Sequence, residues 1–138
     1  MTGVDAVVGT TIVLLYIEGE KGVSIHAGDS RCYLLREDHL SLVTLDHARE
    51  IQTAKGMRKV LTNALSAPGE LSLEVKKFRV QKRDIYLLCS DGLYDNVTPE
   101  LIHETLNSLS LQMGLDSLTS YVLTKEANDN LTAVIVEI

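Results

Sequence analysis

Apolar residues along this chain gather in short runs separated by turn-forming residues, which is the pattern of β-strands. Nearly every position from Thr10 to Ile17 is apolar or β-branched, and a second such run covers Val23 to Ala27. After short polar breaks the pattern returns at Arg31 to Arg36 and again at Leu40 to Thr44. Because tight turns join these four runs, the sequence predicts an antiparallel meander.

The middle of the chain is less regular. Residues 46–63 are mostly polar, their apolar members are spaced loosely as in short helices, and Gly56 interrupts them. We expect irregular or helical structure there. From Leu71 apolar and polar residues alternate, but the apolar face changes near Lys76-Lys77 before the pattern continues to Val80. One extra residue would produce this shift, so the pattern predicts a β-bulge.

The run from Ile85 to Cys89 is apolar on both faces, which indicates a central strand buried on two sides. It stops at Ser90-Asp91-Gly92, so the strand delivers a carboxylate to the edge of its sheet. Glycine at this point permits a sharp turn and the close approach of a ligand. The alternative interpretation of Asp91 is an ordinary turn acid without a ligand.

The last third of the chain predicts two helices followed by a strand. Thr98 can cap a helix from Pro99 to Leu109, which has proline at its first position. Apolar residues at helical spacing indicate a second helix, namely Leu111, Leu115, Leu118 and Val122. Asp129 precedes a final run, Leu131 to Val136, which is apolar on both faces. Antiparallel strands followed by paired helices define the α+β class.

Composition narrows the class of partner and the compartment. The 138 residues fit one domain, and the formal net charge of −6 argues against nucleic acid, whose phosphates require a basic face. No apolar stretch reaches the roughly 20 residues of a membrane helix, and the first residues lack the basic region of a signal peptide. Cys32 and Cys89 lie in strand-like runs, as expected of reduced core thiols in a cytoplasmic protein.

Three acids form the candidate site. Asp91 follows one doubly apolar strand and Asp129 precedes another, so the two carboxylates converge if these strands are antiparallel neighbours. Two such carboxylates repel each other unless a proton or a cation lies between them. Oxygen ligands of this kind suit Mg²⁺ or Mn²⁺. Asp29, at the polar break after the second strand, is the third candidate, and the alternative is that all three are structural turn acids.

Three segments carry a family resemblance. The first starts at residues 9–11, contains residues 26–31 and ends at residues 44–47, the second spans residues 84–95, and the third spans residues 128–134. In order, spacing and strand context they resemble the type-2C (PPM family) metal-dependent serine/threonine protein phosphatases, and the shorter bacterial members most. The resemblance covers almost the whole chain and implies a single type-2C-phosphatase-like domain over residues 1–138.

The resemblance implies a fold and a chemistry. The family fold is a β-sandwich of antiparallel sheets with flanking helices, and its members use Mg²⁺ or Mn²⁺ to activate a water that attacks phosphoserine or phosphothreonine in a phosphoprotein substrate. By resemblance Asp91 and Asp129 match two metal-ligating aspartates. Asp29 matches the acid of a Gly-Asp-Ser-Arg motif that supports the site and can help to hold a further metal. The histidines of this chain match no catalytic position of the family.

The family's Asp-Gly-x-Gly-Gly-His loop, which supplies an aspartate that bridges both metals, is absent from these 138 residues. We therefore expect a domain truncated at its N-terminal side relative to the family, an incomplete sandwich, and weakly bound Mg²⁺ or Mn²⁺. Activity of this chain alone is expected to be weak or absent, and exposed strand edges are expected to favour self-association. The alternative function is a non-catalytic interaction module that keeps the phosphatase-like scaffold and binds a protein partner.

Overall fold

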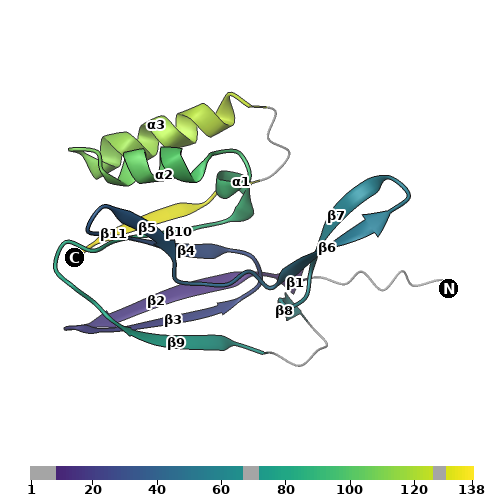
Figure 1. The fold of residues 1–138 in the computed structure, drawn as a ribbon, viewed down its shortest axis with the longest axis horizontal. Coiled ribbons are helices and arrows are strands. Elements are labelled where there is room, and N and C mark those ends of the chain that lie inside the picture. Colours follow the sequence, from purple (N-terminus) through teal and green to yellow (C-terminus); the bar gives the residue numbers. More distant parts are fainter. Residues whose placement is uncertain (1–8, 67–71, 126–129) are drawn as a thin grey trace.

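The computed structural model describes residues 9–66, 72–125 and 130–138. Two antiparallel sheets are stacked, and two helices cover the outer face of one of them (Figure 1). This is the predicted α+β class. The elements in chain order are β1 (Gly9–Thr10), β2 (Ile12–Glu18), β3 (Lys21–Ala27), β4 (Arg31–Arg36), β5 (His39–Leu42), β6 (Ala48–Thr53), β7 (Gly56–Leu61), β8 (Leu65–Ser66), β9 (Glu74–Arg79), β10 (Ile85–Cys89), α1 (Asp91–Tyr94), α2 (Pro99–Leu106), α3 (Leu111–Leu123) and β11 (Ala133–Glu137).

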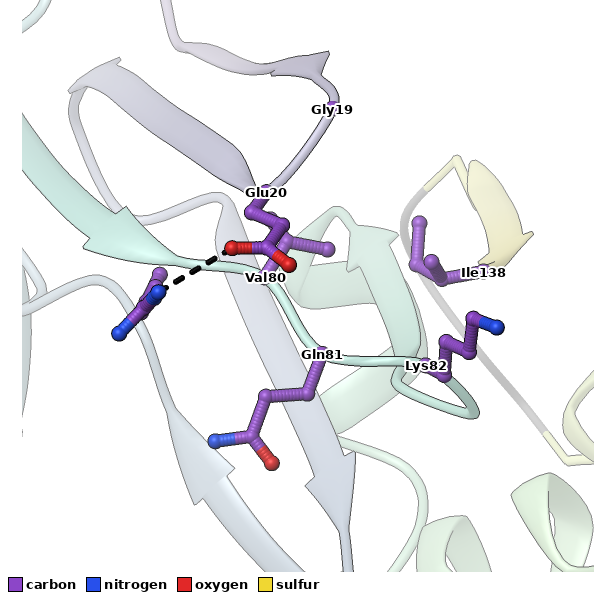
Figure 2. A pocket seen from close by; sticks show the side chains of 7 residues that line it. Gly19, Glu20, Val80, Gln81, Lys82 and Ile138 are labelled. Carbon is purple, nitrogen blue, oxygen red and sulfur yellow. Dashed lines mark hydrogen bonds and ion pairs between the residues drawn. The ribbon is translucent and has the colours of Figure 1, made fainter.

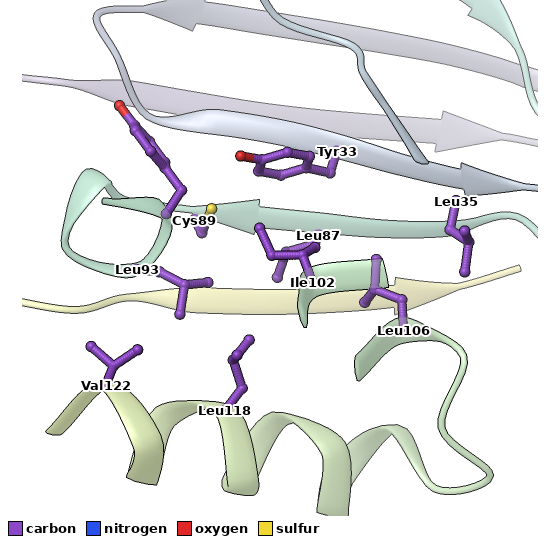
Figure 3. Packing of buried hydrophobic residues seen from close by; sticks show 10 residues of the cluster. Tyr33, Leu35, Leu87, Cys89, Leu93, Ile102, Leu106, Leu118 and Val122 are labelled. Atoms are coloured by element: carbon purple, nitrogen blue, oxygen red, sulfur yellow. The ribbon is translucent and has the colours of Figure 1, made fainter. Parts of the chain in front are cut away.

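Strand β10 is the centre of the larger sheet, whose order is β11-β10-β4-β5. The prediction of a strand buried on both faces is confirmed. Leu87 and Cys89 face the helices, whereas Tyr86 and Leu88 face the second sheet. Figure 3 shows the helix-facing layer, in which side chains of α2 and α3 point toward Leu87. Leu87 is 1% exposed, and burying a leucine this fully contributes about 1.5–3 kcal/mol.

Both cysteines lie in this packed interior. Cys32 is on β4, Cys89 is on β10, and both are free thiols. Burial raises the pKa of each thiol to about 12. They therefore remain protonated at neutral pH and pack as small apolar side chains.

The smaller sheet has the order β2-β3-β9. Strand β9 pairs with β3 in unbroken register, from Arg79 opposite Lys21 to Glu74 opposite His26. The predicted bulge at Lys76-Lys77 is therefore wrong. The apparent change of face arises because Val75 lies on the outer face, where it is 54% exposed. The inward residue is Phe78, whose ring packs against Tyr86 of the other sheet at a centroid distance of 5.9 Å.

The predicted four-stranded meander is also wrong. β2 pairs with β3, and β4 pairs with β5, but β3 and β4 belong to different sheets. Residues 28–30, here called the crossover loop, carry the chain from one sheet to the other. Gly28 has a φ of 113°, which an L-residue rarely adopts, and a Cβ at this position would overlap the side chain of Thr11. The glycine therefore turns the chain out of its first sheet.

Residues 46–63, expected to be irregular or helical, instead contain the hairpin β6–β7. Gly56, with a φ of 107°, pairs with Thr53 and closes the turn. The hairpin projects from the sandwich beside α1 (Figure 1). Because every residue of these two strands is exposed or only partly buried, the hairpin has little apolar alternation by which its sequence could reveal it.

The two predicted helices are confirmed. The Thr98 hydroxyl accepts a hydrogen bond from the backbone N–H of Leu101 and caps α2, which ends at Leu106 rather than at the predicted Leu109. Helix α3 covers the second predicted helix and buries Leu118 and Val122. Within the described residues, no helix has both the length and the apolar character to cross a membrane. Helix α1 is a single turn and was not predicted.

Candidate metal centre

Asp91 lies where β10 ends, as the first residue of α1. The neighbouring Ser90 forms two hydrogen bonds with Thr132, the residue just before β11. The Ser90 N–H donates to the Thr132 carbonyl oxygen at 3.1 Å, and the Ser90 Oγ accepts from the Thr132 N–H at 3.0 Å. A Cβ on Gly92 would overlap the carbonyl oxygen of Asn130. The end of β10 and the segment that enters β11 are thus in direct contact.

The predicted pairing of the two acid-bearing strands is confirmed, because β10 and β11 are antiparallel neighbours with Cys89 opposite Ala133. The acid expected to join Asp91 across this pair is Asp129, which lies outside the described residues. The described chain resumes at Asn130, next to Gly92. The assignment of Asp129 as a metal ligand therefore stays a prediction.

Asp29 is in the crossover loop and is 5% exposed. Its position is tied to α1, because the Tyr94 hydroxyl donates to the Asp29 carbonyl oxygen at 2.6 Å. The Asp29 and Asp91 carboxylates both point toward the ammonium of Lys59. Both lie near the ammonium of Lys59, at 2.6 Å from the Asp29 oxygen and 3.9 Å from the Asp91 oxygen. The structure thus brings two of the three predicted acids to one cation.

Lys59 itself was not predicted. It lies on β7, and its ammonium also donates to the Tyr94 hydroxyl at 3.1 Å. Burial alone lowers the pKa of Lys59, but hydrogen bonds to Asp29 and Tyr94 outweigh this effect and raise the pKa above its ordinary value. Burial raises the pKa of Tyr94 to about 12. At neutral pH the site therefore contains a charged ammonium and a neutral phenol.

Arg31 supports the site from β4. Its guanidinium forms an ion pair with Asp46 at 2.8 Å and donates to the Tyr33 hydroxyl at 2.8 Å. It also lies over the Tyr94 ring, 3.6 Å from the ring centroid, which is a favourable cation–π distance. Arg31 thus packs against Tyr94, the residue that holds Asp29.

A second cluster, formed by His26, His47 and Glu74, lies beside the crossover loop. One ligand atom of each lies within 4.8 Å of the others, a spacing that a metal ion could use. However, the Gly28 N–H donates to His47 Nδ1 at 3.1 Å, so the neutral ring carries its proton on Nε2 and donates to Glu74 at 2.8 Å. His26 Nε2 lies 2.8 Å from the Leu45 carbonyl oxygen and so also carries a proton. Each Nε2 therefore acts as a donor and offers no lone pair to a metal ion, so the cluster suits a structural role.

A surface hollow of about 560 Å³ lies at the opposite end of the larger sheet (Figure 2). It is lined by Gly19, Glu20, Arg79, Val80, Gln81, Lys82 and Ile138. Strand β10 runs from this end, at Ile85, to the carboxylates beyond Cys89, and a strand advances about 3.3 Å per residue. The hollow is therefore separate from the acids and adds nothing to their site.

Known proteins resemble this chain in both sequence and fold. The chain is 30% identical over 142 residues to the serine/threonine phosphatase stp of Listeria innocua, an alignment that covers 94% of this chain and 56% of that protein. The chain thus spans about half the length of the Listeria relative. No family model matches the chain.

Solved structures of bacterial proteins share the fold of this chain. PppA, a key regulatory component of T6SS in Pseudomonas aeruginosa, superposes with a TM-score of 0.82 at 31% identity, covering 96% of this chain and 58% of that one. The catalytic domain of the serine/threonine phosphatase PstP, solved with two manganese ions, gives 0.74 at 32% identity, with 92% and 57% covered. In sequence and in fold, the chain resembles the bacterial metal-dependent serine/threonine phosphatases of the type-2C (PPM) family.

Proposed function

We propose that residues 1–138 form one type-2C-phosphatase-like domain, which contributes part of the metal centre of a protein serine/threonine phosphatase. The observation that carries this proposal is the convergence of Asp29 and Asp91 on a single cation position at the end of the central strand. Relatives named serine/threonine phosphatases share this part of the chain and support the assignment. The substrate class would be phosphoserine or phosphothreonine in a protein.

The donor set fits Mg²⁺ or Mn²⁺. Asp29 and Asp91 offer hard carboxylate oxygens, and the position between them already accommodates a positive charge, that of Lys59. We assign Asp91, Asp29 and Asp129 as the residues that would hold the ion. A divalent ion bound there would supply a water of lowered pKa and neutralise charge on the phosphoryl oxygens.

Residues of this chain have defined tasks toward that ion. Tyr94 fixes the backbone of Asp29, and Arg31 supports the Tyr94 ring from below. The pairing of Ser90 with Thr132 holds the two strand ends together. Because the bridging-aspartate loop of the family is absent from these residues, the ion would be weakly held and turnover by this chain alone would be slow.

A second candidate function is a non-catalytic, phosphatase-like interaction module that acts by binding a protein partner. A specific observation favours it. Among the described strands, β2 and β11 are each paired on one side only, and such edges can pair with another chain. Self-association through these edges and residence in the cytoplasm belong to both versions of the proposal.

Hydrolysis of a phosphothreonine peptide by the purified chain in Mn²⁺ separates the two functions. The phosphatase proposal expects slow, Mn²⁺-dependent release of phosphate that Asp91→Asn abolishes, with Asp116→Asn on the exposed face of α3 as the matched control. Release without Mn²⁺, or release unchanged by Asp91→Asn, would contradict it. Mn²⁺ binding with no release favours the module.

A further inference from the structure

The cation that contacts Asp29 and Asp91 is a side chain of the protein itself, that of Lys59. Lys59 Nζ is 2.6 Å from Asp29 Oδ2, 3.9 Å from Asp91 Oδ2 and within hydrogen-bond distance of the Tyr94 hydroxyl. The Asp29 side chain is only 8% exposed, whereas that of Lys59 is 35% exposed. A nearly buried carboxylate requires an opposite charge, and Lys59 supplies it.

We infer that Lys59 is a built-in counter-ion that occupies the position of a divalent metal between Asp29 and Asp91 and must leave before the metal binds. This inference rests on the proposed metal centre and adds to it a determinant of metal affinity. An ammonium beside a pair of carboxylates weakens the binding of a divalent ion there, because the two cations repel each other and compete for the same oxygens. Metal binding must then include the cost of breaking the Lys59 contacts.

The hairpin makes such an exchange possible. Lys59 is on β7, and β6–β7 form a separate two-stranded sheet that projects from the sandwich (Figure 1). Tyr94 and the crossover loop, by contrast, belong to the packed body, since Tyr94 is 8% exposed and Asp29 is 5% exposed. A lysine side chain is long and flexible, so it can withdraw into solvent while the acids keep their places.

Calorimetric titration of the whole chain with MnCl₂ tests the inference by affinity rather than by activity. Lys59→Met keeps the length of the side chain and removes its charge. We expect it to tighten Mn²⁺ binding about tenfold or more, since a unit charge about 4 Å from a ligand contributes on this scale. Lys55→Met, which removes an exposed lysine from the turn of the same hairpin, is the matched control and is expected to change binding less than twofold.

The titrations distinguish failure of the counter-ion role of Lys59 from failure of the metal centre. If the wild type binds Mn²⁺ and Lys59→Met binds it equally or more weakly, the counter-ion role is overturned while the metal centre stands. If neither protein binds Mn²⁺, the proposed metal centre fails and the inference fails with it. Because loss of the Lys59 contacts can destabilise the fold, Lys59→Gln, which is also neutral but keeps a hydrogen-bond donor, is titrated in parallel. Circular dichroism confirms that each variant is folded. Adding Asp91→Asn to Lys59→Met must abolish the gain in affinity, and a gain that persists would also overturn the inference.

Discussion

The hydroxyl of Tyr94 donates a 2.6 Å hydrogen bond to the backbone carbonyl oxygen of Asp29. This contact joins residues 65 positions apart and fixes the crossover loop against the short helix that begins with Asp91. The same hydroxyl accepts from Lys59. One buried phenol thus sets the relative positions of both described acids and of the cation between them.

Tyr94→Phe should therefore destabilise the protein by about 1–3 kcal/mol, because it leaves a buried carbonyl oxygen without its donor. Urea denaturation followed by circular dichroism measures the change in the free energy of unfolding. Tyr121→Phe is the matched control, since Tyr121 is 45% exposed on α3 and its loss is expected to cost less than about 0.5 kcal/mol. Equal effects of the two substitutions would contradict the role given to Tyr94.

The buried acid Asp84 should make stability depend on pH. It accepts two hydrogen bonds from the Arg36 guanidinium, at 2.9 and 2.7 Å, and further ones from the Gln81 backbone and the Tyr86 hydroxyl. Burial alone raises the pKa of Asp84, but these bonds outweigh it and hold the pKa below its ordinary value of 3.8. A carboxyl with a depressed pKa in the folded state stabilises the fold above its unfolded pKa, and this contribution is lost as the pH falls through the folded pKa.

Asp84→Asn is expected to cost about 3 kcal/mol at pH 7, the lower end of the range for breaking a buried ion pair. The difference from the wild type should shrink as the pH is lowered below 4. Urea midpoints measured from pH 7 to pH 3 test both parts. Glu20→Gln breaks an exposed ion pair with Arg79 and should change stability by less than about 1 kcal/mol at any pH. A constant difference across the pH range would exclude the proposed linkage.

Gly28→Ala should displace the crossover loop. The φ of 113° is unfavourable for alanine, and the added Cβ would overlap Thr11. We expect a loss of about 1–3 kcal/mol of stability, as for other strained backbone positions. Gly19→Ala, at a turn with φ 58° where a Cβ meets nothing within 4 Å, controls for backbone strain without the overlap and should cost less. Urea denaturation of the two variants compares them directly.

The open strand edges should produce self-association. Val134 on β11 is 52% exposed, and β11 pairs on one side only among the described strands. Sedimentation analysis at rising protein concentration is expected to show growing mass for the wild type. Val134→Lys should suppress this growth, because a lysine on an edge strand opposes pairing with another chain. A wild type that stays monomeric at every concentration would refute the prediction.

The sequence predicted the parts of the fold that depend on local patterns. The doubly buried strand Ile85–Cys89 has the predicted bounds, as does Arg31–Arg36, because burial forces apolar residues onto both faces. The Thr98 cap was predictable because capping depends on neighbouring residues alone. The α+β class followed from these elements.

Contacts between distant segments were not predictable in this way. Separation of β3 and β4 into two sheets depends on the backbone of Gly28, which a strand–turn–strand pattern does not reveal. The β6–β7 hairpin was missed because it buries few apolar residues. For the same reason Lys59 was missed, since one lysine in a polar segment carries no pattern, and only the fold brings it to Asp29.

We propose above that Asp29 and Asp91 are ligands in a divalent metal site. Crystals of the chain soaked in MnCl₂, with anomalous diffraction recorded at the manganese edge, test it most directly. We expect an anomalous peak bonded to the Asp91 carboxylate and beside that of Asp29, with the Lys59 side chain turned away. A peak confined to His26, His47 and Glu74, or no peak at the two aspartates under saturating Mn²⁺, would contradict it.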